Sequence, residues 1–252
     1  MAKRRRPYSI SLFFGMLSNY FLYSALNEKK RMFWLGYIFA PTAGLYCDYF
    51  FILLLITQGF YCFLLKRRQT GFLTSALISL IIFLPWMPGF LSKFSIINRG
   101  FWIPSPVISS FAISLENFLL GHNVSQRIYW LGTGLICLVV IAAFSTMIKD
   151  SQSRKPLIFC FFFLACPLIL AYLISLKITP IYLDRKFIIF SPYLYLILSF
   201  GIVQIQKFWM KTFLLAGFCI ILILGVFAYF SFQMSTPFRH HIGVHLKRPI
   251  RP

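Results

Sequence analysis

The chain has 252 residues, of which 59% are hydrophobic, and it carries 25 basic residues against only 5 acidic ones. This apolar share exceeds the roughly 45 to 50% of soluble domains and excludes an ordinary soluble fold. A net charge of +20 in a soluble protein would suggest nucleic acid. Here, however, the basic residues flank apolar runs and no nucleic-acid-binding module is recognisable. We therefore expect an all-α, polytopic membrane protein that contacts membrane lipid and binds no nucleic acid.

Apolar runs recur along the whole chain, and about 20 mostly apolar residues suffice to cross a bilayer. The stretch from Met32 to Lys66 would measure roughly 50 Å as one helix, so we place a break at Pro41-Thr42-Ala43-Gly44. Residues 1–232 then form one transmembrane helical domain, followed by a basic tail, 233–252. We predict eight crossings, two of them short, at residues 8–26, 32–45, 46–65, 71–91, 128–147, 157–176, 187–205 and 212–232.

Basic residues set the predicted orientation of these crossings. Alternate loops on one side hold eleven Lys and Arg residues, whereas the opposite internal loops hold six. The positive-inside rule makes the first side cytoplasmic, although the basic cluster Lys3–Arg6 at the outer N-terminus opposes this assignment. The outer side then holds the one long loop, residues 92–127. Within it, Val107–Leu120 is amphipathic and suits a helix that lies on the membrane.

A short charged turn, Lys177–Lys186, separates two of the apolar runs on the outer side. Tyr182 and Arg185 are three residues apart and would share a face if the next helix began there. A guanidinium suits bidentate recognition of phosphate, and Lys186 adds a second charge. The turn is thus a candidate socket for a phosphate at the membrane surface. The alternative is that Asp184 pairs with Arg185 or Lys186 while the basic side chains reach ordinary lipid headgroups.

Asp48 is the only acid in apolar sequence between residues 32 and 65. Its carboxylate either caps a helix through hydrogen bonds or is available for acid–base or metal chemistry. No complete set of metal ligands is recognisable, so we assign no metal-binding residue and no cofactor. The expected membrane fold would still be compatible with a divalent metal. The six cysteines show no ligand spacing and are interpreted as packing residues.

Five short segments follow one another along the chain: Arg6-Pro7-Tyr8, Gly44–Phe50, Leu84-Pro85-Trp86, Phe101–Pro104 and Pro180–Phe187. In this order and spacing the chain resembles the later part of membrane glycosyltransferases of the GT-C fold. The resemblance is to glycosyltransferase family 39 and to bacterial relatives that add sugars to lipid A or cell-envelope glycans, and it covers about residues 4–232. Each segment alone is only weak evidence for the family, whereas the five segments in this order are more specific evidence.

The resemblance implies transfer of a sugar from a polyprenyl-phosphate carrier to an acceptor on the outer face of the bacterial inner membrane. Two departures from the family stand out. Asp48 occupies a position where relatives often have His, and the family's catalytic acid lies in a first outer loop ahead of the matched segments. We therefore expect a truncated or split enzyme that depends on a companion polypeptide with the N-terminal spans. By the resemblance, the carrier phosphate would contact Arg185, Tyr182 and Lys186, and the sugar or acceptor would contact Trp102, Pro104, Asp48 and Tyr49.

Two alternatives remain open at this point. A transporter or flippase of a lipid-linked or anionic substrate would use the same outer cations, but transporters commonly contain internal repeats and polar residues on broken helices. A non-catalytic membrane scaffold would need no base at all. No catalytic residue is assigned from the sequence.

Overall fold

The computed structural model describes residues 8–28, 30–65, 68–89, 106–120, 126–177 and 181–235, and within these ranges the fold is helical without strands. The elements of the fold are α1 (Tyr8–Asn27), α2 (Arg31–Cys47), α3 (Phe51–Leu64), α4 (Gln69–Phe83), η1 (Leu84–Trp86), α6 (Ser109–Leu120), α7 (Gln126–Lys149), α8 (Ser151–Lys177), η2 (Asp184–Phe190), α9 (Ser191–Val203) and α10 (Phe208–Ser235). The two longest of these helices, α8 and α10, belong to the second half of the chain.

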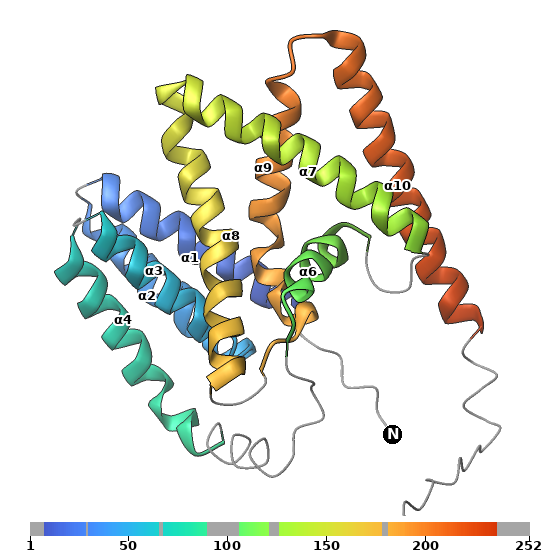
Figure 1. Cartoon of the computed structure of the whole chain (residues 1–252). Coiled ribbons are helices and arrows are strands. Elements are labelled where there is room, and N and C mark those ends of the chain that lie inside the picture. Colours follow the sequence, from blue (N-terminus) through green and yellow to red (C-terminus); the bar gives the residue numbers. More distant parts are fainter. Residues whose placement is uncertain are drawn as a thin grey trace, which may run out of the picture.

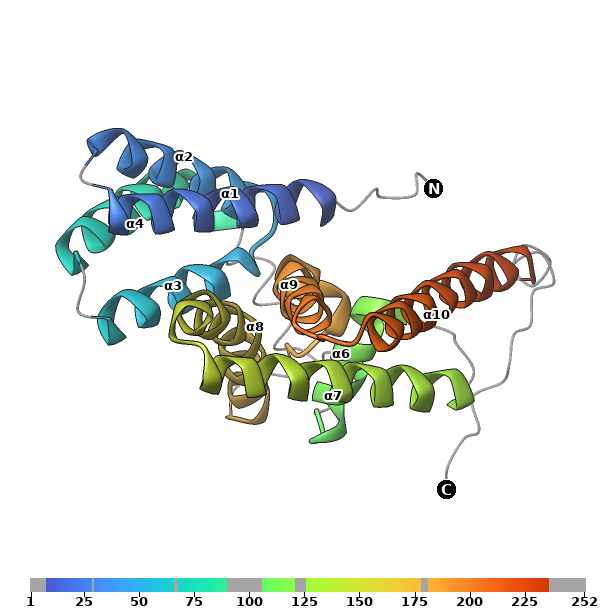
Figure 2. The same cartoon turned by 90° about the horizontal axis from the view of Figure 1, so that it is seen from above.

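The helices form two groups that meet at η2 and α9. Helices α1 to α4 lie together on one side, and α7, α8 and α10 surround α9 on the other (Figures 1 and 2). Contacts of α1 with η2 and of α3 with α8 join the two groups. In the most apolar stretch of the span Arg185–Val203, 56% of the residues are buried inside the molecule. In the corresponding stretch of α10 the buried share is 22%. The residues after the charged turn therefore lie in the centre of the molecule, while α10 presents its sides outward.

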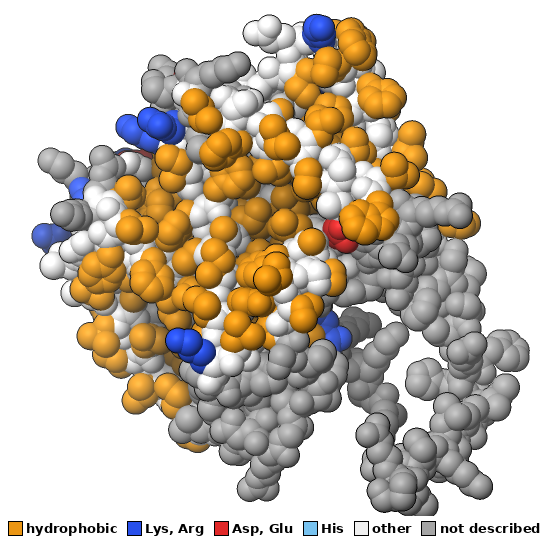
Figure 3. Space-filling view, viewed as in Figure 1, with side chains coloured by type: hydrophobic (Ala, Val, Ile, Leu, Met, Phe, Trp, Pro, Cys, Tyr) orange, Lys and Arg blue, Asp and Glu red, His pale blue; other side chains and the backbone are white. Residues whose placement is uncertain are grey.

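Within the described ranges, five helices are long and apolar enough to cross a membrane, and their exposed surfaces are suited to lipid. Apolar side chains cover the middle of the visible face, while the basic side chains lie mostly along its margins (Figure 3). This arrangement supports an integral membrane protein. The predicted number of eight crossings is not confirmed, since α3 and the apolar part of α7 are shorter than a full span and α2 has 17 residues.

The predicted break at Pro41-Thr42-Ala43-Gly44 is wrong, because α2 continues through it to Cys47. Proline removes one backbone donor, but hydroxyls can satisfy the carbonyls nearby within a membrane helix. Pro41 leaves the Tyr37 carbonyl without its helical donor. Thr42 Oγ1 and Ser79 Oγ both donate to the next carbonyl, that of Ile38, at 2.7 and 3.1 Å. The chain turns instead at Asp48, whose backbone is extended, with φ −151° and ψ 127°.

A buried polar network ties four helices together on the inside. Tyr37 Oη donates to Gln58 Oε1 at 2.7 Å, and Gln58 Nε2 donates to Ser18 Oγ at 2.9 Å and to Asn19 Oδ1 at 2.8 Å. Asn19 Nδ2 in turn donates to the Tyr193 hydroxyl. These side chains come from α1, α2, α3 and α9 and are almost fully buried. Because their polar groups bind one another, the bundle gains cohesion without exposing them to lipid.

The turn between α2 and α3 depends on a close approach of Gly44 to the ring of Phe51. A Cβ added at Gly44 would overlap three atoms of that fully buried ring, whereas one added at Gly134 in α7 would meet nothing within 4 Å. We predict that Gly44→Ala lowers the free energy of unfolding by roughly 1 to 3 kcal/mol through overpacking. Gly134→Ala should be neutral or raise it by at most about 1 kcal/mol through helix propensity.

Thermal unfolding of the detergent-solubilised variants, followed by tryptophan fluorescence, tests this pair. Equal midpoints for Gly44→Ala and Gly134→Ala would contradict the packing at this turn.

Candidate functional site

A buried ion pair joins two segments that are 138 residues apart in the sequence. Lys186 Nζ lies 2.6 Å from Asp48 Oδ2, and the side chains are 24% and 7% exposed. Such a pair has to overcome the cost of removing two charges from water, so its geometry and its other hydrogen bonds matter. It fixes the turn between α2 and α3 against η2.

Asp48 is positioned by the turn that it forms. Its N–H donates to the Gly44 carbonyl at 2.9 Å and closes α2. Its Oδ1 accepts from the Phe50 N–H at 3.1 Å, as an Asx turn does before a helix. The Phe51 N–H then donates to the Asp48 carbonyl at 3.0 Å, where α3 begins. One carboxylate oxygen therefore holds the turn while the other binds Lys186, so the structure favours the helix-cap interpretation of this acid.

Lys186 is presented by the short 3₁₀ helix η2. Its N–H donates to the Leu183 carbonyl at 2.8 Å, and Ile189 anchors η2 by packing where Gly15 leaves room on α1. The ammonium lies 5.3 Å from the centre of the Phe50 ring and 5.6 Å from that of Tyr8. Rings at this distance attract a cation through their quadrupole. The Lys186 charge is thus held by one carboxylate and two aromatic rings.

Tyr182 is buried and binds α6. Its hydroxyl lies 2.9 Å from Ser114 Oγ and 3.3 Å from the Ser110 carbonyl, and its N–H donates to Ser175 Oγ at 2.8 Å. Because η2 begins only at Asp184, Tyr182 precedes the helix, and the condition for sharing a face with Arg185 is not met. The hydroxyl contacts seen here anchor the turn to α6. The ring packs on Phe111, Tyr172 and Phe187.

Arg185 is half-buried and adjoins the ion pair in sequence. Its guanidinium stays charged under all physiological conditions. Arg185 thus places a second cation next to the ion pair of Lys186 and Asp48. The side chain of Asp184 lies outside what the structure describes. Its predicted pairing is therefore not tested, but Lys186 pairs with Asp48.

The segment around Tyr49 connects the ion pair to the end of α4. Trp86 Nε1 donates to the Tyr49 hydroxyl at 2.9 Å, and the Tyr46 hydroxyl donates to the Ile82 carbonyl at 2.8 Å. Asp48 and Tyr49, predicted to face the sugar or acceptor, are thus brought to the same end of the bundle as Lys186. The other two residues of that prediction, Trp102 and Pro104, lie outside the described residues.

The remaining outer acid, Glu116, is directed elsewhere. It accepts a hydrogen bond from Thr133 of α7, whereas Ser114, two residues earlier on α6, contacts Tyr182. Among the described residues, no three His, Cys, Asp or Glu side chains gather to hold a metal ion. No ligand set for a divalent cation can therefore be named at this end.

Sequence reasoning selected both Asp48 and Lys186 but missed that they bind each other. One signal was available: a lone acid and a basic residue were both predicted at the outer ends of apolar runs, where an unpaired charge is costly. The buried network around Gln58 was missed altogether. Comparison of the chain with protein families, with curated proteins and with solved structures finds no match. The family resemblance thus rests on the ordered segments alone.

The buried pair can be tested by a double-mutant cycle. Asp48→Asn keeps an oxygen for the Phe50 N–H, and Lys186→Met keeps the length of the side chain. We expect each single change to lower the free energy of unfolding by roughly 3 to 5 kcal/mol, because each leaves an uncompensated buried charge. The double variant should lose clearly less than the sum of the two.

The exposed pair of Lys30 with Glu28, at 3.3 Å, provides the control. Glu28→Gln should change the free energy of unfolding by less than about 1 kcal/mol. Strict additivity of the two changes at Asp48 and Lys186 in thermal or chemical unfolding would show that the pair contributes no coupling.

Proposed function

We propose that the chain is the carrier-binding part of an integral-membrane glycosyltransferase, which moves a sugar from a polyprenyl phosphate to an acceptor on the outer face. One observation carries the proposal: segments that were matched by order alone meet in space. Tyr8, the Asp48 turn and Lys186 lie around one ion pair, and Trp86 is bound to the adjacent Tyr49. Four of the five segments that define the resemblance thus contribute to one end of the bundle.

The charges at this end suit a phosphate leaving group. In the proposed reaction the bond between the sugar carbon and the phosphate oxygen breaks, the acceptor hydroxyl forms the new bond, and its proton passes to a base. Negative charge grows on the polyprenyl phosphate, where fixed cations are most useful. Arg185 would be the main ligand of that phosphate. Lys186 would add a second N–H while Asp48 holds it in place.

The base is not assigned within this chain. Asp48 is bound to Lys186, Glu28 to Lys30, and Glu116 and Asp150 accept hydrogen bonds from Thr133 and Ser153. The side chain of Asp184, the fifth acid, lies outside the described residues. On the family resemblance, the proposal includes a companion polypeptide that supplies the acid-bearing outer loop and the N-terminal spans. Its active face would be the outer face of a bacterial inner membrane, opposite the side that is richer in Lys and Arg.

A transporter or flippase of a lipid-linked or anionic substrate would use the same outer cations. Such a function would need polar groups inside the bundle to line a path for the substrate. The candidate is the buried network of Gln58, Asn19, Tyr37 and Tyr193. Its groups, however, bind one another across four helices, which suits packing better than a transport path. A catalytically inactive scaffold would retain the fold but not the affinity for the carrier.

We expect Arg185→Ala to weaken binding of a polyprenyl monophosphate by about tenfold or more, because a hydrogen bond to a charged group contributes roughly 1.5 to 3 kcal/mol. Native mass spectrometry of the detergent-solubilised protein, titrated with the lipid, measures this. Arg154→Ala, at an exposed arginine near the start of α8, is the matched control and should bind as the unchanged protein does.

The catalytic part of the proposal needs a second measurement. Coexpression with the reading frame directly upstream should yield transfer of labelled sugar from polyprenyl phosphate to an envelope glycan, and Arg185→Ala should abolish it. Carrier affinity that is unchanged in Arg185→Ala would exclude the role given to this residue. Binding without transfer in any combination would favour the transporter, and the absence of carrier binding would favour the scaffold.

A further inference from the structure

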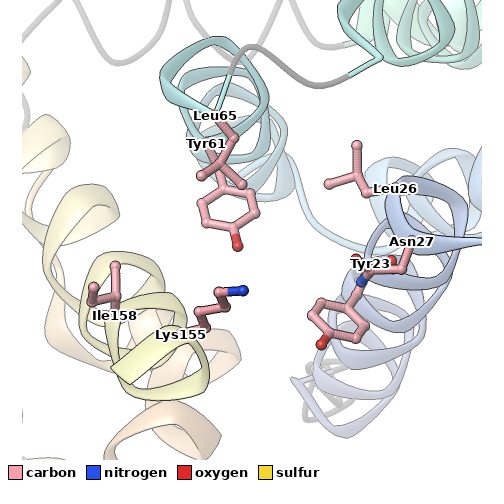
Figure 4. Close-up of a pocket in the computed structure, with 7 residues that line it drawn as sticks. All are labelled: Tyr23, Leu26, Asn27, Tyr61, Leu65, Lys155 and Ile158. Atoms are coloured by element: carbon pink, nitrogen blue, oxygen red, sulfur yellow. Dashed lines mark hydrogen bonds between the residues drawn. The ribbon is translucent and has the colours of Figure 1, made fainter. Parts of the chain in front are cut away.

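A pocket of about 240 Å³ opens between α1, α3 and α8 at the end of the bundle remote from Asp48 and Lys186. Helix α1 begins at Tyr8 beside Lys186 and ends at Asn27 in the pocket wall, which separates the two sites by about 30 Å along the helix axis. The pocket belongs to the side richer in Lys and Arg. Its lining consists of Tyr23, Leu26, Asn27, Tyr61, Leu65, Lys155 and Ile158 (Figure 4).

One cation and one phenol face each other across this pocket. The Lys155 ammonium and the Tyr61 hydroxyl point toward one another from α8 and α3 (Figure 4). Among the described residues, no carboxylate lies within ion-pair distance of Lys155, in contrast to Lys186 with Asp48 and Lys30 with Glu28. The pocket therefore offers a positive charge that the protein itself does not neutralise.

The walls of the pocket are fixed by packing around Phe159. Its ring lies 5.1 Å from that of Tyr61 and 6.0 Å from that of Tyr23, and thus holds α8 against both α3 and α1. Lys155 and Phe159 are four residues apart and share one face of α8. The Asn27 side chain donates to the Tyr23 carbonyl at 2.9 Å and secures the end of α1. Packing of the helices thus fixes the backbone positions from which Lys155, Tyr61 and Tyr23 reach the pocket.

The pocket is amphipathic, and its apolar part is open. Leu65 and Ile158 are 45% and 46% exposed, so they line a surface on which a hydrocarbon chain can lie. A second cation close by is already engaged, since the Arg68 guanidinium donates to the Ala25 and Glu28 carbonyls at 2.6 and 2.8 Å. Among these neighbouring cations, Lys155 is the one that faces the pocket with its charge available.

We infer that this pocket binds the headgroup of an anionic phospholipid. The phosphodiester would accept hydrogen bonds from Lys155 and Tyr61, and the acyl chains would pass over Leu65 and Ile158 toward the bilayer. Basic pockets between membrane helices on the positively charged side recognise such headgroups in this way. The assignment does not depend on the proposed glycosyltransferase function, because the two sites lie at opposite ends of α1.

The experiment compares three variants in a neutral detergent titrated with phosphatidylglycerol, and native mass spectrometry counts the bound lipid. We expect Lys155→Gln to weaken binding by about tenfold, as the loss of a charged hydrogen-bond donor does. Tyr61→Phe keeps its ring packed on Phe159 and should weaken binding by a smaller factor. Arg154→Gln removes the same charge one residue away, outside the pocket, and should leave the affinity unchanged.

Two further arms decide the kind of ligand. Phosphatidylcholine has the same phosphodiester but carries a choline cation that offsets its charge. At the same concentration it should bind more weakly, and Lys155→Gln should reduce its binding by a smaller factor than that of phosphatidylglycerol. Equal losses for Lys155→Gln and Arg154→Gln would mean a diffuse charge effect and would overturn the site. Displacement of phosphatidylglycerol by an equal concentration of inorganic phosphate would overturn the lipid assignment in favour of a soluble phosphate. Thermal midpoints confirm that the variants remain folded.

Discussion

The ion pair of Asp48 and Lys186 is the contact on which the arrangement of its end of the bundle depends. Asp48 lies in apolar sequence and Lys186 ends a charged turn, and neither charge tolerates burial alone. Their pairing at 2.6 Å requires the turn between α2 and α3 to lie against η2. Gly15 then brings α1 onto Ile189, and Phe50 and Tyr8 close over the ammonium. Elements from three parts of the chain are thereby fixed around one interaction.

The two ends of the bundle use their cations differently. At one end Lys186 is compensated by Asp48, and at the other end Arg68 is bound to two backbone carbonyls. Both stabilise the fold. Lys155, in contrast, faces an open pocket without a compensating carboxylate among the described residues. A surplus of basic residues therefore does not identify binding sites by itself. Whether each cation is compensated by the protein is the more informative property.

Much of the fold was predictable because hydrophobic length alone specifies membrane helices. Every predicted crossing coincides with a helix, and the amphipathic segment Val107–Leu120 contains α6. The break in the second crossing was placed at Pro41, but the helix continues there, with hydroxyls of Thr42 and Ser79 bound to the nearby Ile38 carbonyl, and the actual turn is at Asp48. Local propensity could not reveal this, since Ser79 belongs to another helix. The pairing of Asp48 with Lys186 likewise depends on how helices align, which no single segment encodes.

The same ion pair limits what each cation can do for an anionic ligand. If a phosphate drew Lys186 away, Asp48 would remain as a 7% exposed carboxylate next to a second negative charge. Leaving a buried charge without its partner costs roughly 3 to 5 kcal/mol. A new hydrogen bond from the ammonium to the phosphate returns only about 1.5 to 3 kcal/mol. Lys186 is therefore more stable on Asp48 and can at most share a phosphate through another N–H. The residue whose engagement with a phosphate leaves the buried pair intact is Arg185.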